Sequence, residues 1–275
     1  MNIGFDAKRA FHNNSGLGNY SRTLIDNLSS LYPENHYFLY NPREKPGRFD
    51  HIIKRSNIIV RYPITFLARK ISSLWRSFLI LKDIKKDQLD IFHGLSNELP
   101  LNIHKSRIKK VVTVHDLIFL RYPELYGAID RNTYKAKTAY SCKNADVIIA
   151  ISEQTKKDLI EFLRVPSNKI KVVYQSCDEQ FLRSIPEVEK NAVRVKYGLP
   201  EKFILNVGTI EERKNLLGLV KAINILKEQI NHKLVVIGKP TSYKKKVKNY
   251  ISANGLEDKV VFLENVDFKD FPAIY

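Results

Sequence analysis

The sequence predicts an α/β protein with parallel β-sheets, divided into two domains. Short apolar runs alternate with helical patterns along the chain, which is typical of parallel sheets covered by helices. This alternation breaks at a charged segment near residues 181–200 and then resumes. The length of 275 residues agrees with two domains, since domains commonly have about 100–200 residues.

The first domain is predicted to span residues 1–182 and to contain one parallel sheet. Its expected strands are short apolar runs bounded by polar or turn residues: 2–6, 37–40, 58–62, 90–93, 111–115, 147–151 and 170–174. Between them, apolar residues at helical spacing predict helices, notably over 20–31, 64–85, 131–142 and 153–163. Strands that are separated by helices usually pair in parallel, so we expect these strands to do the same.

Residues 183–200 are interpreted as a linker, because Pro186 and Pro200 bracket a charged segment without a clear pattern. The second domain, 201–275, resumes the alternation with strands over 203–208, 233–237 and 260–263 and helices over 216–229 and 243–253. A further helix starts near residue 268. Since a complete Rossmann-type domain has two βαβαβ halves, this domain is incomplete, and we expect the natural chain to continue well past Tyr275.

The composition is strongly basic, with a formal net charge of +17. Such a charge favours polyanionic partners, namely nucleic acid, an anionic membrane face or phosphate-bearing substrates; the alternative is a generally basic, solvated surface. Cys142 and Cys177 lack metal-ligand spacing and are expected to be reduced thiols. The N-terminus lacks a secretory pattern, and no apolar run approaches the ~20 residues of a membrane span, which predicts a cytoplasmic protein.

The segment 64–86 suggests a peripheral position on the inner face of the cell membrane. On a helical wheel its apolar residues share one face, opposite Arg69 and Arg76: Leu67, Ile71, Leu74, Trp75, Phe78 and Leu81. Tryptophan and basic residues suit a helix at an anionic lipid surface. The alternative is an ordinary helix that packs on the sheet.

Two glycine-containing turns lie where a strand leads into a helix. The first contains Gly16 and Gly18, and its bare backbone and the following helix N-terminus suit a phosphate; without the full G-x-G-x-x-G fingerprint, a structural turn is the alternative. The second begins at Gly208 and carries Arg213 and Lys214 at the carboxyl end of a strand, where open α/β sheets bind ligands. This basic pair suits a diphosphate, and the alternative is a solvated helix start.

His93 and His115 end two of the predicted strands. A single histidine at a strand end is commonly a hydrogen-bonded structural residue. Two of them at the carboxyl ends of neighbouring strands favour a role in a cleft.

Together these residues resemble the family-four retaining glycosyltransferases of GT-B fold, especially the bacterial mannosyltransferase-like members. The resemblance spans the whole chain and is most specific over 15–20, 112–124, 150–159 and 203–217. It implies two facing Rossmann-like domains, the second incomplete. The N-terminal domain is then expected to hold the acceptor, and the C-terminal domain the nucleotide sugar.

The resemblance also implies roles for the residues of these motifs. Arg213 and Lys214 would neutralise the donor diphosphate and the charge that develops as it leaves. Gly16 and Gly18 would close over that diphosphate from the facing domain. His115 is the implied catalytic residue, beside the transferred sugar.

The implied reaction is transfer of a hexose from a nucleotide diphosphate sugar, with retention at the anomeric carbon. GDP-mannose is the preferred donor, and a glycan or lipid-linked molecule in surface polysaccharide synthesis is the acceptor. No cofactor or bound metal is implied, and the sequence has no Asp-x-Asp motif.

Two features depart from the family pattern. Residues 173–178 read Val-Tyr-Gln-Ser-Cys-Asp, where the family commonly has an Asn-Gly-Val-Asp turn, and only Asp178 matches. The family's two glutamates spaced eight apart, which grip the donor sugar and the ribose, normally lie downstream of Tyr275. We therefore expect the 275-residue chain alone to have little or no transferase activity.

Other classes explain less of the sequence. An NAD(P) oxidoreductase would need G-x-G-x-x-G followed about 20 residues later by a ribose-binding acid, and this pattern is missing. A nucleic-acid-binding module would need a helix-turn-helix, zinc-finger or RNP signature, none of which is found. A catalytically incomplete fragment or a non-catalytic binding relic is the remaining alternative, if the gene itself ends at Tyr275.

Overall fold

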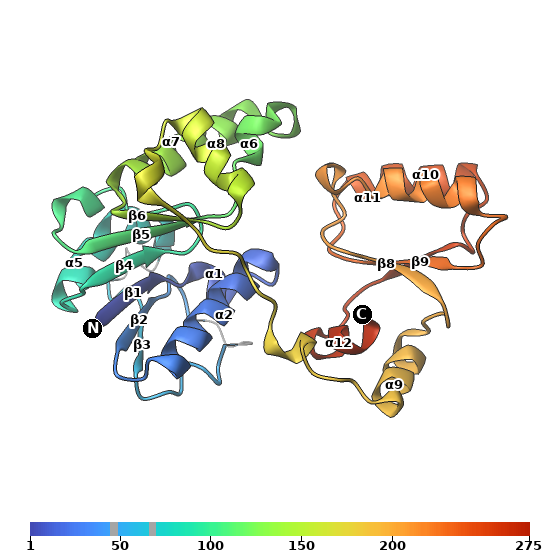
Figure 1. The fold of residues 1–275 in the computed structure, drawn as a ribbon, viewed down its shortest axis with the longest axis horizontal. Coiled ribbons are helices and arrows are strands. Elements are labelled where there is room, and N and C mark those ends of the chain that lie inside the picture. The colour runs from blue at the N-terminus through green and yellow to red at the C-terminus, as the bar shows by residue number, and fades with distance from the viewer. Residues whose placement is uncertain (45–48, 66–69) are drawn as a thin grey trace. The chain divides into compact units, whose positions relative to one another are not determined.

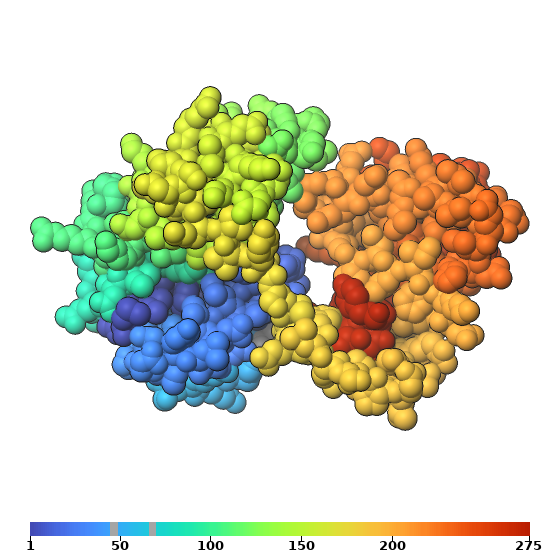
Figure 2. All heavy atoms as spheres, viewed as in Figure 1, coloured from blue at the N-terminus to red at the C-terminus, as the bar shows by residue number. Residues whose placement is uncertain are grey.

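The computed structural model describes residues 1–44, 49–65 and 70–275. The chain divides into two compact units, Met1–Ser176 and Cys177–Tyr275. In each unit, helices cover both faces of a sheet (Figure 1). Residues 173–178 lead from one unit into the next as a single segment without helix or strand (Figure 2).

The sheet of the first unit is parallel throughout, in the order β3-β2-β1-β4-β5-β6-β7. The strands are β1 (Asn2–Asp6), β2 (His36–Tyr40), β3 (Ile58–Arg61), β4 (Ile91–Gly94), β5 (Lys109–Val114), β6 (Val147–Ala150) and β7 (Ile170–Val172). This sheet confirms the predicted α/β class. Because the strand order reverses between β1 and β4, the carboxyl ends of these two strands form the edge at which such sheets bind ligands.

Helices pack on both faces of this sheet. The described helical segments are α1 (Lys8–His12), α2 (Gly16–Leu31), α4 (Ser72–Leu74), the π-helical turn η1 (Trp75–Leu79), α5 (Ile80–Lys86), η2 (Ile103–Lys105), α6 (Ile118–Arg121), η3 (Pro123–Leu125), α7 (Ala128–Asn144), α8 (Glu153–Leu163) and η4 (Ser167–Lys169). One core lies under α5, α7 and α8 and includes Phe92 and Val112. The other lies under α1 and α2 and includes Phe5 and Ile25. Burial of each such side chain stabilises the fold by about 1.5–3 kcal/mol. Since many of these side chains belong to the strands, their packing holds the strands and their ends in place.

The segment 64–85 does not form the single helix that was predicted. Its described part is broken into α4, η1 and α5. A π-helical turn changes the helical register, so residues on either side of it face different directions. In this turn Trp75 is buried, and its indole N–H donates to Asp83 at 2.8 Å.

The second unit has a three-stranded parallel sheet in the order β10-β9-β8. Its elements are η5 (Glu179–Phe181), α9 (Glu187–Tyr197), β8 (Phe203–Val207), η6 (Glu212–Lys214), α10 (Leu216–Leu226), β9 (Lys233–Ile237), α11 (Tyr243–Ala253), β10 (Val260–Leu263), η7 (Phe268–Asp270) and α12 (Phe271–Ile274). α10 and α11 cover one face of this sheet, and α9 and α12 cover the other (Figure 1).

The prediction that residues 183–200 form a linker is wrong, because the helix α9 occupies most of this stretch. Pro186 stands at the N-cap of this helix, and Gly198 ends it in the left-handed conformation with φ of 59°. Val193 and Leu199 are buried in the core with Ile237. This stretch therefore folds as part of the second unit, and the boundary between the units lies earlier in the chain.

Candidate active site

A largely buried ion pair marks the carboxyl end of β1. The Arg76 guanidinium, held by the turn η1, donates from Nε to both Asp6 oxygens at 3.2 Å and from Nη2 to Oδ2 at 2.5 Å. Burial by itself would raise the pKa of Asp6, but the charge and hydrogen bonds of Arg76, with weaker help from Lys8, lower it below its usual range. Asp6 is therefore ionised and bidentately held at the edge where β1 and β4 meet.

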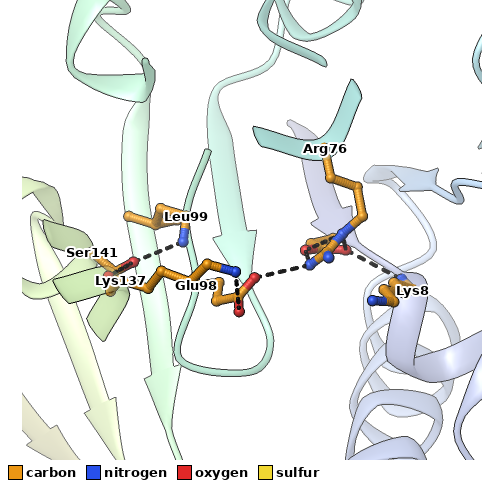
Figure 3. Close-up of polar contacts among 7 residues, drawn as sticks. Lys8, Arg76, Glu98, Leu99, Lys137 and Ser141 are labelled. Carbon is orange, nitrogen blue, oxygen red and sulfur yellow. Dashed lines mark hydrogen bonds and ion pairs between the residues drawn. The ribbon is translucent and has the colours of Figure 1, made fainter. Parts of the chain in front are cut away.

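A small cavity adjoins this pair and is lined by charged groups. Glu98, in the loop after β4, bridges Arg76 at 3.4 Å and the Lys137 ammonium at 3.3 Å (Figure 3). The backbone N–H of Leu99 donates to the Ser141 hydroxyl at 2.8 Å, which holds the Glu98 loop against α7. The loop and its carboxylate are thus positioned by elements from both sides of the strand-order reversal.

These contacts correct the predicted membrane face of 64–86. Trp75 is only 2% exposed and belongs to the core, whereas an interfacial tryptophan would lie at the surface. Arg76 is paired inside the molecule with Asp6 instead of facing lipid. Leu67 and Arg69 lie outside the described residues. Over the described ranges, the structure contains no helix with the length and apolar character needed to cross a membrane.

His115 follows β5 and lies in a closed hydrogen-bond arrangement. Its Nε2 is 2.9 Å from the Leu95 carbonyl oxygen, so Nε2 carries a proton and donates. Its Nδ1 is 3.0 Å from the Gln175 amide nitrogen, which donates to it. Burial lowers the pKa of His115, although the bond to Leu95 and the Asp116 charge oppose the shift. The imidazole is therefore neutral, with its acceptor nitrogen facing the last residues of the first unit.

His93 has an internal role in the structure. Its Nε2 is hydrogen-bonded to the Thr113 hydroxyl at 2.8 Å, and the same hydroxyl bonds the Tyr20 hydroxyl at 2.9 Å. Burial, with a smaller effect of His115, lowers the pKa of His93 to about 3. The Tyr20 ring packs edge-on against His115 with centroids 4.8 Å apart. His93 therefore ties β4, β5 and α2 together and indirectly supports His115.

The hydrogen bond from Gln175 predicts a pKa change that can be measured directly. In a Gln175→Glu variant a carboxylate replaces the donor at Nδ1, which favours the protonated imidazole and is expected to raise the pKa of His115 by about one unit or more. Nitrogen-15 NMR of labelled histidine, titrated with pH, measures this pKa and the tautomer. Gln88→Glu adds the same charge at an exposed position before β4, at the opposite edge of the sheet from His115, and should leave the titration of His115 unchanged. An unshifted His115 in Gln175→Glu would contradict the hydrogen-bond arrangement.

The two glycines before α2 differ in their surroundings. Asn13 Oδ1 accepts hydrogen bonds from the Ser15 N–H, the Ser15 hydroxyl and the Gly18 N–H at 2.7–3.1 Å, which closes the turn. A Cβ atom on Gly18 would lie 1.8 Å from the Asn13 carbonyl oxygen, whereas one on Gly16 would meet no atom within 4 Å. Close packing therefore explains why residue 18 is a glycine. At Gly16 no such contact exists, and the loop has space for a ligand there.

Gly208 ends β8 in a backbone conformation that other residues rarely adopt, with φ of 153°. Its N–H donates to the Ile237 carbonyl at 2.9 Å, so β8 and β9 remain paired at their ends. Gly238, which the sequence analysis missed, is instead required by packing, because a Cβ there would lie 1.7 Å from the Gly208 oxygen. The sequence signal that could have identified Gly238 is its position directly after β9, the strand next to β8.

The basic pair of the second unit lies in η6, between β8 and α10. Arg213 is ion-paired with the partly exposed Glu211 at 2.6 Å. Lys214 is exposed and forms no ion pair within the described parts of the chain. Asn215, with φ of 52°, caps α10 by accepting from the Gly218 N–H at 3.2 Å. The turn thus presents two cations and a helix N-terminus at the carboxyl end of β8, which suits an anionic ligand.

Two parallel α/β units, with glycine turns and basic residues at their strand ends, define a protein of the GT-B glycosyltransferase type. Residues 14–181 match the family model described as Glycosyltransferase Family 4, and residues 189–275 match the model described as Glycosyl transferases group 1. The chain belongs to glycosyltransferase family 4, which confirms the predicted family.

Mannosyltransferases are among the similar proteins. O-antigen chain mannosyltransferase B of Escherichia coli is 23% identical over 276 residues, which cover 95% of this chain and 70% of that protein. The serotype-specific mannosyltransferase WbdA of Escherichia coli is 29% identical over 154 residues, 54% of this chain and 19% of its own length. The yeast alpha-1,3/1,6-mannosyltransferase ALG2 is 22% identical over 82% of this chain and 48% of its own length.

Solved structures confirm the GT-B fold. Anabaena HepE, crystallised with UDP-glucose, superposes with a TM-score of 0.67 at 18% identity, over 99% of this chain and 70% of HepE. WaaG, a glycosyltransferase involved in lipopolysaccharide biosynthesis, superposes with a TM-score of 0.66 at 14% identity, over 100% of this chain and 72% of its own.

Proposed function

We propose that the protein transfers a hexose, with retention at the anomeric carbon, from a nucleotide diphosphate sugar to a glycan or lipid-linked acceptor. The observation that carries this proposal is the turn after β8, where Arg213 and Lys214 stand beside the constrained backbone of Gly208. The names of the similar mannosyltransferases favour mannose, and GDP-mannose is the preferred donor. HepE was crystallised with UDP and with UDP-glucose, which supports a nucleotide-sugar donor for the fold.

In this mechanism the second unit supplies charge to the leaving group. Arg213 and Lys214 bind the diphosphate and stabilise the negative charge that grows on it as the bond to the sugar breaks. Arg213 exchanges the Glu211 carboxylate, 33% exposed, for a phosphate oxygen of the donor. Lys214 needs no such exchange, because it forms no ion pair in the described parts of the second unit.

The first unit supplies the acceptor side and a neutral imidazole. The crevice at the ends of β1 and β4 is the proposed acceptor region, since it lies at the reversal of strand order. His115 is proposed to accept a hydrogen bond from a sugar hydroxyl at Nδ1, in place of the Gln175 amide. Being neutral, it orients the hydroxyl without adding positive charge beside an oxocarbenium-like transition state. The loop with Gly16 and Gly18 is proposed to bind phosphate at the start of α2 through N–H groups that precede Gly18, whose own N–H donates to Asn13.

Calorimetric titration with GDP, UDP and ADP tests the donor site. One nucleotide is expected to bind, and Arg213→Ala/Lys214→Ala is expected to weaken it by roughly ten-fold or more per side chain, because each removes a charge-assisted hydrogen bond. Lys190→Ala/Arg194→Ala on α9 removes the same charge from the opposite side of the sheet and is the matched control. Equal nucleotide affinity in the parent chain and the Arg213/Lys214 variant would exclude this turn as the diphosphate site.

A further inference from the structure

Two basic side chains near the end of β1 form no ion pair with the residues that the structure describes. Lys8 and Arg9 begin α1, directly after Asp6 and Ala7, and both are half-buried. Across residues 1–44, 49–65 and 70–275, neither side chain forms an ion pair or a hydrogen bond. Holding two such cations partly out of water is unfavourable unless an anion offsets their charge.

The same region contains further positive charge. Arg76 and Lys137 line the cavity beside Asp6, and the Lys8 N–H donates to Asp6 at 3.2 Å. Figure 3 shows Lys8 near Arg76. Burial, followed by the charges of Arg76 and Arg9, lowers the pKa of Lys8, and Asp6 and Glu98 offset this only in part. Arg9 also lowers the pKa of His115, so its charge reaches that imidazole as well. The basic cluster, defined as Lys8, Arg9, Arg76 and Lys137, thus extends from the cavity toward His115.

The two carboxylates of this region differ in how firmly they are held. Asp6 is bound bidentately by Arg76, with a shortest distance of 2.5 Å, and is 14% exposed. Glu98 makes the longest ion pairs of the group, 3.4 Å to Arg76 and 3.3 Å to Lys137, and is 31% exposed. Glu98 is therefore the carboxylate that an incoming anion can replace between these two cations.

We propose that the basic cluster binds a phosphate group carried by the acceptor, and that Glu98 occupies part of this site until the acceptor arrives. The proposal rests on the proposed function, because it assigns the crevice of the first unit to the acceptor. The guanidinium groups of Arg9 and Arg76 supply planar donor pairs that match phosphate oxygens, and the two lysines supply point charges. A phosphorylated saccharide or a polyprenyl-phosphate-linked saccharide would provide the same group.

Phosphate binding to the Arg213→Ala/Lys214→Ala chain tests this site, because that background removes the proposed donor site. Methyl phosphate is titrated at constant ionic strength and followed calorimetrically. Lys8→Gln/Arg9→Gln in this background is expected to weaken binding by roughly ten-fold or more. Lys156→Gln/Lys157→Gln on α8 removes the same charge elsewhere on the first unit and should leave the affinity unchanged. Thermal unfolding of each variant checks that the fold is retained.

A Glu98→Gln variant tests the role of the carboxylate. It removes the competing charge and keeps the side-chain shape, so methyl phosphate should bind several-fold more tightly. No binding of methyl phosphate by the background chain, or equal affinity in Lys8→Gln/Arg9→Gln, would overturn the site. Equal affinity in Glu98→Gln would overturn the proposed exchange.

Nucleotide titration separates this proposal from the donor assignment. With Arg213 and Lys214 intact, Lys8→Gln/Arg9→Gln should bind the nucleotide as the parent chain does. Loss of nucleotide affinity in that variant would mean that the cluster serves the donor, and would overturn its assignment to the acceptor. If no nucleotide binds the parent chain but methyl phosphate still depends on Lys8 and Arg9, the donor assignment fails and the anion site stands. Comparison of a phosphorylated saccharide with a polyprenyl phosphate in vesicles then distinguishes the two sources of the phosphate.

Discussion

A Gly18→Ala substitution is expected to lower the free energy of unfolding of the first unit by about 3 kcal/mol or more. The new Cβ would lie 1.8 Å from the Asn13 carbonyl oxygen, so the turn must open. That oxygen cannot simply retreat, because Arg22 Nη1 donates to it at 2.9 Å and to the Ala10 carbonyl at 2.7 Å. Opening the turn also breaks the bond from the Gly18 N–H to the Asn13 side chain.

Gly16→Ala is the matched control for this prediction. No atom lies within 4 Å of the Cβ it would add, and Gly16 is the first residue of α2. Its stability should equal that of the parent chain or rise by a few tenths of a kcal/mol, because alanine restricts the unfolded chain more than glycine does. Urea unfolding followed by the fluorescence of Trp75, the one tryptophan in the sequence, reports on the first unit. Equal destabilisation by the two substitutions would show that the turn is held together differently.

The same pair of variants separates structure from function in this loop. If Gly16 is needed for the close approach of a phosphate, Gly16→Ala should fold as the parent chain does and still bind nucleotide more weakly. A stable Gly16→Ala variant with unchanged nucleotide affinity would remove Gly16 from the donor site. Gly18 cannot be tested in this way, since its loss disturbs the fold first.

The strands and most helices could be predicted because their signals are local. The strands around β4 and β5 are short apolar runs, and α8 and α11 begin and end at the predicted residues. α2 begins at Gly16 instead of at residue 20, because the Asn13 side chain closes the turn before it. α9 was missed because few of its side chains are buried, so its apolar pattern is weak and its charges resemble those of a linker.

The sequence locates candidate site residues at glycine turns and strand ends but gives no indication of the long-range pairs that the structure forms. Arg76 and Asp6 are separated by 70 positions, and Gln175 and His115 by 60. No local pattern links residues so far apart in the sequence, and only the sheet order and the π-helical turn bring Arg76 to β1. For the same reason Arg76 was interpreted as a basic residue flanking the apolar face of a helix at a lipid surface, whereas its partner is the largely buried carboxylate of Asp6 at a strand end.

Removal of the Asp6–Arg76 ion pair is the second substitution with a large expected effect on the free energy of unfolding. Asp6→Asn is expected to cost about 3 kcal/mol near neutral pH, because it leaves the largely buried Arg76 guanidinium with only its longer ion pair to Glu98, at 3.4 Å. The side chains of both residues are only 14% exposed, so solvent screens the pair weakly. Glu161→Gln, which removes the exposed carboxylate paired with Arg121 at 3.1 Å, is the control and should change stability by less than about 1 kcal/mol.

The pH dependence of stability provides an independent check on the same pair. Because the folded pKa of Asp6 lies below its ordinary value of 3.8, its contribution is complete above that value and is lost as the pH falls through the folded pKa. The difference in unfolding free energy between the parent chain and Asp6→Asn should therefore be constant above about pH 5 and shrink below pH 4. A double variant, Asp6→Asn/Arg76→Met, should recover part of the loss, since no unpaired charge remains buried. If the single variant loses stability equally at acidic and neutral pH, the loss comes from packing and the ion pair contributes little.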